Sequence, residues 1–166
     1  MRIKSKTKLL IGGALVLAST LPYTAFARSE VCRATNEKEI AKLFNRWNED
    51  LQSGDAHRVA ENYAKKSILL PTVSNKPRLT EEEKLDYFEH FQAKKPAGKI
   101  DSSNIQIDCN TAIDAGIYTF TFGDGKQVQA RYTYTYKWFP KQKQWLITSH
   151  HSSAMPEKVL EVPATN

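Results

Sequence analysis

The sequence predicts an α+β domain in which N-terminal helices pack on a curved antiparallel sheet. Two observations predict this fold class. Apolar residues recur at helical spacing in the first half of the chain, whereas in the second half they alternate with polar residues at strand spacing. Helices followed by several long strands fit a layer of helices on a sheet that curls around them. Such a sheet commonly leaves a cone-shaped cavity between itself and the helices.

The first helix is predicted between a capping box, Asn36 with Glu39, and a break at Gly54. Asp55 then caps a shorter helix that we expect to carry Tyr63. The apolar residues of the first helix are Ile40, Leu43, Phe44, Trp47 and Leu51. Trp47 and Tyr63 either line the mouth of the cavity or belong to the core.

A short apolar strand, Ser67 to Leu70, separates the second helix from a loop at 72–79. Thr80 and Glu83 form the capping box of a third helix. Period-two alternation then predicts strands at 100–108, 112–122, 128–139 and 144–153. Gly123 to Lys126 is a hairpin turn between two of them.

The first 27 residues have the pattern of a cleavable secretory signal peptide. Four basic residues precede a 13-residue run, Leu9 to Leu21, and Ala25-Phe26-Ala27 is a small-x-small cleavage site. The run is shorter than the roughly 20 apolar residues that cross a membrane. We therefore expect cleavage after Ala27, a periplasmic or secreted protein, and no membrane attachment after cleavage.

Most of the net positive charge comes from this segment. The chain has 24 Lys and Arg against 18 Asp and Glu, a formal charge of +6. Removal of residues 1–27 takes away four basic residues and no acidic one, which leaves 20 against 18 and a charge near +2. This balance gives no reason to expect nucleic-acid binding. Residues 28–166 are predicted to form a single domain with its core at about 36–157.

The two cysteines, Cys32 and Cys109, are predicted to form a disulfide because an exported chain meets an oxidising compartment. They lack the C-x-x-C spacing of a redox pair. The bond would close a loop of nearly 80 residues.

The strand at 128–139 has two unlike faces. Its even positions are mostly aromatic, whereas its odd positions are polar and include Arg131. If the polar face turned toward the cavity, Arg131 would bind an anion there. The alternative is a half-buried strand whose polar face is solvated.

No motif in the sequence specifies a metal or a cofactor. His150 and His151 are neighbours on a strand, so they point to opposite faces and cannot chelate one ion together. A histidine beside serines is a general base, a pocket wall or a satisfied core residue. Neither a G-x-S-x-G elbow nor a nucleotide-binding glycine motif is present. Asp86, Asp108 and Asp114 are candidate proton-abstracting carboxylates.

Several segments together resemble the association (hub) domain of calcium/calmodulin-dependent protein kinase II, and more broadly the nuclear transport factor 2-like, or SnoaL-like, superfamily of cone-shaped α+β folds. They are Gly54-Asp55, Asp86-Tyr87-Phe88, Ala130-Arg131-Tyr132, and Trp145 to Pro156 with its His151-x-Ser153. The resemblance covers about Asn36 to Glu157. Exported bacterial relatives are sometimes labelled oxidoreductases of the SgcJ/EcaC kind, and no residue here supports that label.

The resemblance implies that Arg131 and His151 line a polar pocket that accepts small carboxylates, and Ser153, Trp47 and Tyr63 complete the candidate ligand-binding set. It also implies homodimers or larger rings that assemble through the convex face of the sheet, where the aromatic residues of the strand at 128–139 would be buried. An exported protein without a kinase domain cannot serve kinase assembly.

Two functions remain open at this point. The first is an exported, homo-oligomeric binding module whose cavity holds a small anionic organic ligand. The second is a cavity enzyme of the ketosteroid isomerase or polyketide cyclase type, without a dinucleotide cofactor, in which a carboxylate or His151 moves a proton. A structural domain with a vestigial pocket is the third alternative.

Overall fold

The computed structural model describes residues 30–72 and 74–156 of the 166-residue chain. The segment predicted as a signal peptide lies outside the described residues, so its cleavage stays a prediction. The described residues from Val31 onward belong to one compact unit. Within the part of the chain that the structure describes, no helix is long and apolar enough to cross a membrane.

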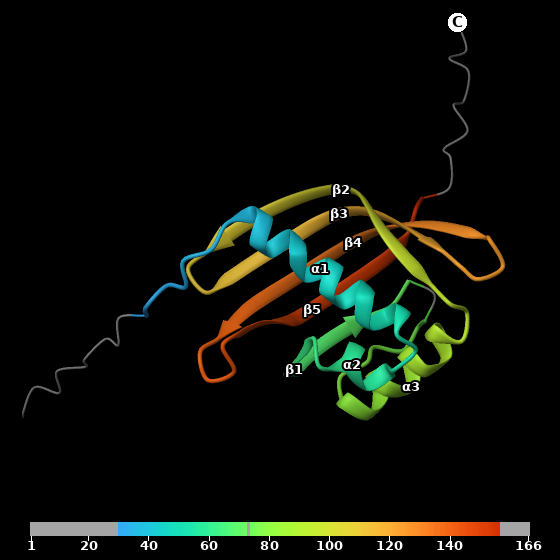
Figure 1. Ribbon diagram of the computed structural model, residues 1–166, viewed down its shortest axis with the longest axis horizontal. Coiled ribbons are helices and arrows are strands. Elements are labelled where there is room, and N and C mark those ends of the chain that lie inside the picture. Colours follow the sequence, from blue (N-terminus) through green and yellow to red (C-terminus); the bar gives the residue numbers. More distant parts are fainter. Residues whose placement is uncertain (1–29, 73, 157–166) are drawn as a thin grey trace, which may run out of the picture. The chain divides into compact units, whose positions relative to one another are not determined.

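Three helices and five strands make up the described fold (Figure 1). In chain order they are α1 (Glu37–Gln52), α2 (Ala56–Ala60), β1 (Tyr63–Leu70), α3 (Glu81–Gln92), β2 (Ala97–Asp108), β3 (Thr111–Thr121), β4 (Gln127–Phe139) and β5 (Gln144–Ala154). The predicted caps are confirmed, because Asn36, Asp55 and Thr80 each accept a hydrogen bond from the first turn of their helix. The predicted extent of the second helix is wrong: it ends at Ala60, and Tyr63 is the first residue of β1.

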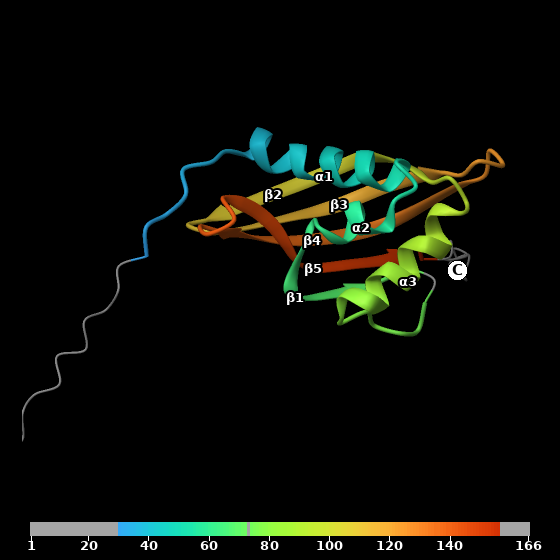
Figure 2. The same cartoon turned by 60° about the horizontal axis from the view of Figure 1, so that its bottom comes forward.

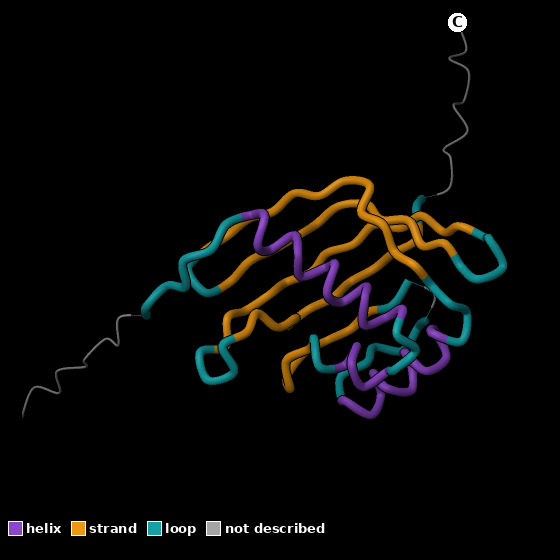
Figure 3. The backbone as a smooth tube through the Cα atoms, viewed as in Figure 1, coloured by secondary structure: helices purple, strands orange, loops and turns teal. Residues whose placement is uncertain are grey.

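The strands form one sheet in the order β1-β5-β4-β3-β2. β2 to β5 are an antiparallel meander, and β1 joins the edge parallel to β5. Figure 3 shows the long strands running side by side, with α1 across them and α2 and α3 gathered near β1. The α+β class and the helix-then-meander order are therefore confirmed.

The sheet has an inner face, which carries the core, and an outer face. The inner face of β4 consists of the even-numbered residues, and Tyr132, Tyr134 and Tyr136 are each at most 3% exposed. The rings of Phe44 and Trp47 on α1 pack edge-on against Tyr134, with centroids 6.3 and 6.0 Å away. Figure 2 shows α1 lying along the sheet. The expectation that this aromatic face serves an oligomer interface is wrong, because the helices already cover it.

The predicted disulfide is confirmed. Cys32 and Cys109 are bonded, with their Cα atoms 4.4 Å apart. The bond fixes the segment before α1 to the turn between β2 and β3. Arg33 strengthens this attachment, because its guanidinium lies 4.7 Å from the ring centre of Trp138 and its backbone N–H donates to the Asn110 side chain at 2.8 Å.

Candidate functional site

A pocket of about 1020 Å³ lies between α3, the hairpin that joins β3 to β4, and the inner face of the sheet. Its walls are mainly aromatic and aliphatic. They include Leu69, Phe88, Phe91, Phe120, Phe122 and Val128. An apolar chamber of this size with a few convergent polar groups is the usual form of a small-molecule site.

Three hydroxyl groups converge at one end of the pocket, and we call this cluster, together with His150, the polar end. The hydroxyls of Thr72 and Ser152 are hydrogen-bonded to each other, and Tyr118, whose phenol is influenced by both, lines the same pocket. Burial raises the pKa of Tyr118, so the phenol stays protonated and can donate a hydrogen bond. Three neutral hydroxyls therefore face one small volume.

The chain reaches this arrangement from three separate elements. Ser152 lies on the inner face of β5 and Tyr118 on the inner face of β3. β1 ends at Leu70 because the next residue, Pro71, has no N–H to continue the ladder, and Thr72 follows Pro71 directly. Because Leu70 is in register with His151 on the parallel neighbour β5, the chain leaves β1 beside Ser152.

His150 is the one imidazole at the polar end, and it is 4% exposed. Burial, and to a smaller degree the neighbouring His151, lowers the pKa of His150 to about 3, so its ring is neutral at physiological pH. The His150 Nδ1 lies 2.8 Å from the hydroxyl of Tyr63, which in turn accepts a hydrogen bond from the Trp47 indole at 3.2 Å. The buried Nε2 of His150 has no hydrogen-bond partner among the described residues.

A β-bulge in β5 decides which residues face the pocket. Tyr136 pairs with Ile147, but its neighbour Thr135 pairs with Ser149, so Thr148 is an extra residue in β5. Without it, alternation from the buried Ile147 would place residues 149, 151 and 153 inside. With it, His150 and Ser152 point inward. His151 and Ser153 were expected here instead, and the bulge turns their neighbours His150 and Ser152 inward.

The expectation that Arg131 and His151 line the pocket is therefore wrong. Both side chains are exposed on the outer face, where the Arg131 guanidinium donates to the Ala154 carbonyl at 3.4 Å. Ser153 pairs with Arg131 and shares that face. Of the other predicted residues, Trp47 lines the pocket, whereas Tyr63 lies behind its wall and contacts it through His150.

None of the three candidate carboxylates lies in this pocket. Asp86 is paired with Arg78 at 2.6 Å on α3, and Asp108 is exposed at the end of β2. Asp114 is buried, accepts hydrogen bonds from Ser103 and Tyr132, and borders a smaller groove beside α1. The acidic residue on the pocket lining is Asp124, which pairs with Lys126 at the hairpin.

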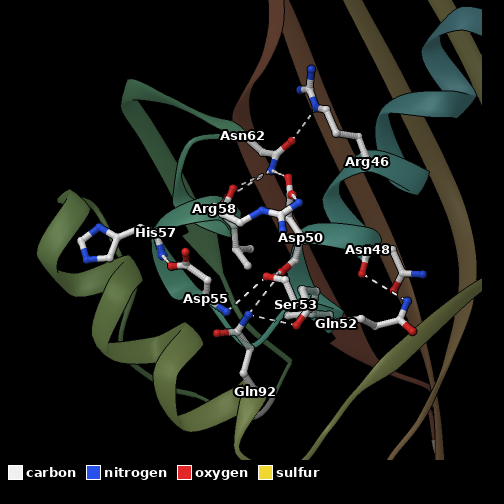
Figure 4. A network of polar contacts seen from close by, with 12 residues as sticks. Arg46, Asn48, Asp50, Gln52, Ser53, Asp55, His57, Arg58, Asn62 and Gln92 are labelled. Carbon is white, nitrogen blue, oxygen red and sulfur yellow. Dashed lines mark hydrogen bonds and ion pairs between the residues drawn. The ribbon is translucent and has the colours of Figure 1, made fainter.

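A polar network holds the elements that carry Trp47 and Tyr63 (Figure 4). Asn62, next to Tyr63, donates to Asp50 on α1 at 2.7 Å and accepts from Arg46 at 2.7 Å. Arg46 also donates to the Trp145 carbonyl on β5 at 3.0 Å. The network therefore ties α1, the start of β1 and β5 together one residue away from the Trp47 and Tyr63 side chains.

In the described ranges no three His, Cys, Asp or Glu side chains gather as metal ligands would. The groups of the polar end are three hydroxyls, which both donate and accept, and one neutral imidazole. The lysines on the pocket lining are Lys94, Lys95 and Lys126, which belong to the surrounding loops.

Residues 36–156 match the family model of the calcium/calmodulin-dependent protein kinase II association domain. Among solved structures, a protein from Xanthomonas campestris described as such a domain is similar, with 45% identity over 76% of this chain and 96% of that one, and a TM-score of 0.70. A cyanobacterial iota-carbonic anhydrase complexed with bicarbonate has 21% identity, coverage of 77% and 97%, and a TM-score of 0.69. An NTF2-like protein from Novosphingobium aromaticivorans has 14% identity, coverage of 74% and 83%, and a TM-score of 0.61. No curated protein sequence matches significantly.

Proposed function

Because this chain belongs to the calcium/calmodulin-dependent protein kinase II association domain family, within the nuclear transport factor 2-like superfamily, we propose that its pocket carries a reaction available to this fold: the interconversion of carbon dioxide and bicarbonate. The cluster of Thr72, Tyr118 and Ser152 beside the neutral His150 is the observation that carries the proposal.

The polar end suits a small, oxygen-rich group rather than a strongly held anion. Each hydroxyl offers one donor and two acceptor positions, so the cluster can hold a water molecule and contact an oxygen of carbon dioxide at once. A buried anion that meets only neutral donors is held less tightly than one paired with a cation. Bicarbonate bound to Thr72, Tyr118 and Ser152 would therefore be released readily, as turnover requires.

The reaction requires that water and carbon dioxide be held next to each other and that carbon dioxide be polarised. The oxygen of a bound water attacks the carbon of carbon dioxide, one carbon–oxygen π bond opens onto an oxygen, and one proton leaves to solvent. The Tyr118 phenol, kept protonated by burial, donates to the oxygen on which negative charge develops. Ser152 and Thr72 orient the water and relay its proton toward the solvent. The apolar wall beyond them, with Phe88 and Phe120, accommodates the uncharged gas.

The cyanobacterial carbonic anhydrase that was solved with bicarbonate is 21% identical to this chain. At that identity it supports the proposal at the level of the fold alone. The assignment to this chain rests on its own hydroxyl cluster.

A second candidate ligand, a larger organic carboxylate, is favoured by the size of the pocket. The chamber of about 1020 Å³ exceeds the volume of bicarbonate several times, and its aromatic walls extend to the loop lysines Lys94, Lys95 and Lys126. Such a ligand would place its carboxylate near a lysine and its apolar part against Phe91 and Phe122. This is the binding-module alternative, with its anion site moved away from Arg131.

We also infer that the protein is exported and self-associating. Export rests on the signal-peptide pattern, and a disulfide between Cys32 and Cys109 suits an oxidising compartment. For self-association, family membership and the outer face give support. Aromatic rings of α1 and α3 pack against the inner face of the sheet. The outer face carries the exposed isoleucine Ile113 among threonines, which gives it an apolar group that a second chain could cover. A second copy of the chain is the occupant we propose for it.

The test is the rate at which the purified protein hydrates carbon dioxide, followed by the colour change of a pH indicator after rapid mixing. Acceleration over buffer, lost on heat denaturation, is the expected result. If the rate equals that of buffer while acetate or a longer carboxylate binds in calorimetry, the binding-module alternative replaces the enzyme.

A further inference from the structure

Three buried side chains are linked by hydrogen bonds in a series that ends at His150 of the polar end. Trp47 on α1, Tyr63 at the start of β1 and His150 on β5 are 2%, 7% and 4% exposed. The Trp47 Nε1 lies 3.2 Å from the Tyr63 hydroxyl, and that hydroxyl lies 2.8 Å from His150 Nδ1. The last member, His150, lines the pocket, and its Nε2 has no partner in the described part of the chain.

The direction of each hydrogen bond follows from what each group can donate. An indole nitrogen can only donate, so the Tyr63 oxygen accepts from Trp47. Burial keeps the pKa of Tyr63 well above its usual value, so its own hydrogen stays on the oxygen. Within the described residues, the acceptor in reach of that hydrogen is His150 Nδ1. The alternative, in which Nδ1 donates to Tyr63, would leave the hydrogen of a buried phenol without an acceptor.

A neutral imidazole whose Nδ1 accepts a hydrogen bond carries its hydrogen on Nε2. Protonation of both nitrogens is opposed by burial. The titratable groups beside the ring are Tyr63 on β1, Tyr134 on β4 and His151 on β5, and Lys84 on α3 lies next to Tyr63. Lys84 lies 5.9 Å from the Tyr63 ring centre and donates to the carbonyls of Ser67, Leu79 and Thr80. Because its ammonium group donates, Lys84 does not accept the hydrogen of the Tyr63 hydroxyl.

We propose that Tyr63, oriented by Trp47, is a positioning residue that fixes His150 in its Nε2–H tautomer, so that His150 donates a hydrogen bond to an oxygen of the pocket's ligand instead of acting as a base. The donor role rests on the proposed binding of bicarbonate. The tautomer does not, since it follows from protein groups alone.

The tautomer is tested by nitrogen-15 NMR of the full protein, in which two-bond couplings distinguish a protonated ring nitrogen from an unprotonated one. Between pH 6 and 8 the expected spectrum shows Nε2 protonated and Nδ1 unprotonated for His150. In Tyr63→Phe the Nδ1 hydrogen bond is lost, and the expected spectrum shows the two tautomers mixed. Tyr87→Phe removes another phenol of the pocket wall and should leave the His150 tautomer unchanged. A wild-type spectrum with Nδ1 protonated, or with both nitrogens protonated, would overturn the proposal without any variant.

The donor role is tested on the same sample by titration with bicarbonate. Saturation should shift the Nε2–H resonance, and His150→Gln, whose amide can donate near the same place, should retain more affinity than His150→Leu, which should lose about tenfold. If carbon dioxide is hydrated while bicarbonate leaves this resonance unmoved, the donor role fails and the proposed function stands. If bicarbonate binds nowhere and no hydration occurs, the proposed function fails and the tautomer is judged by its own spectrum.

Discussion

The hydroxyl of Thr72 is hydrogen-bonded to the hydroxyl of Ser152, although 80 residues separate them in the chain. Thr72 follows the end of β1, and Ser152 lies on β5, so the bond depends on the parallel pairing of these two strands. Parallel pairing brings the end of the edge strand β1 beside the end of β5, the last strand of the meander. The polar end of the pocket therefore exists because β1 joins the sheet at this edge.

Thr72→Val keeps the shape of the side chain and removes its hydroxyl, so it tests the contribution of this bond to ligand binding. We expect bicarbonate affinity to fall by about tenfold, because one donor of the cluster is lost and the Ser152 hydroxyl is left without its protein partner. NMR titration with bicarbonate measures the change. Thr133→Val on the outer face is the matched control, and equal affinity losses in both variants would contradict the assignment of the site.

Acid should destabilise the protein through His150. The pKa of this residue is about 3 in the folded protein and near 6.5 in an unfolded chain. Between these values the unfolded state binds a proton that the folded state does not, so stability is complete above about pH 6.5 and falls as pH decreases. From pH 7.5 to 5.0 the loss from this group is about 2 kcal/mol.

Urea denaturation at the two pH values measures this loss as a difference between variants. His150→Gln should lack the 2 kcal/mol component, whereas His151→Gln, on the outer face, should retain it. If both variants lose stability with acid as the wild type does, His150 is not held neutral by burial.

Reduction of the Cys32–Cys109 disulfide should destabilise the domain. The bond joins residues 77 apart, for which the chain-entropy model gives an upper figure of roughly 4 to 5 kcal/mol. Denaturation of the Cys32→Ser, Cys109→Ser double variant against the oxidised wild type measures the loss. A mass difference of two protons between reduced and untreated protein establishes the bond first. An unchanged unfolding midpoint would show that the attached segment contributes nothing to the core.

Self-association through the outer face is tested with two isoleucines of equal exposure. Ile113 and Ile107 are both 37% exposed, but Ile113 pairs with Thr135 on the outer face, whereas Ile107 pairs with Ala112, whose side chain lies in the core. Light scattering should show a dimer or larger assembly for the wild type and for Ile107→Asp, and a monomer for Ile113→Asp. A monomeric wild type at high concentration would refute the self-association.

Much of the fold could be predicted because local signals agree with the final structure. The capping residues Asn36, Asp55 and Thr80 mark the helix starts, and the change from helical to strand periodicity marks the sheet. Tyr63 was misplaced because α2 is a single short turn, and its continuation pairs with β5, a contact that only the folded chain provides.

The site was less predictable, because its geometry depends on one residue of register. The extra residue at Thr148 exchanges the faces of everything that follows it in β5, so the inward pair is His150 and Ser152 and not His151 and Ser153. No local pattern in the sequence announces a bulge of this kind. Arg131 was expected in the cavity because the family resemblance implied it, but the aromatic face of β4 buries far more apolar surface and therefore takes the inner side.

The proposal that the polar end hydrates carbon dioxide is decided by one measurement. It compares the hydration rates of the wild type, Ser152→Ala and Ser153→Ala side by side. Each variant removes one serine hydroxyl, and the two serines are neighbours on opposite faces of β5. We predict that Ser152→Ala lowers kcat/KM by about tenfold or more, as loss of a group that contacts the reacting atoms does. We predict that Ser153→Ala stays within about twofold of the wild type. A wild type that does not accelerate hydration, or equal rates for the two variants, would contradict the account.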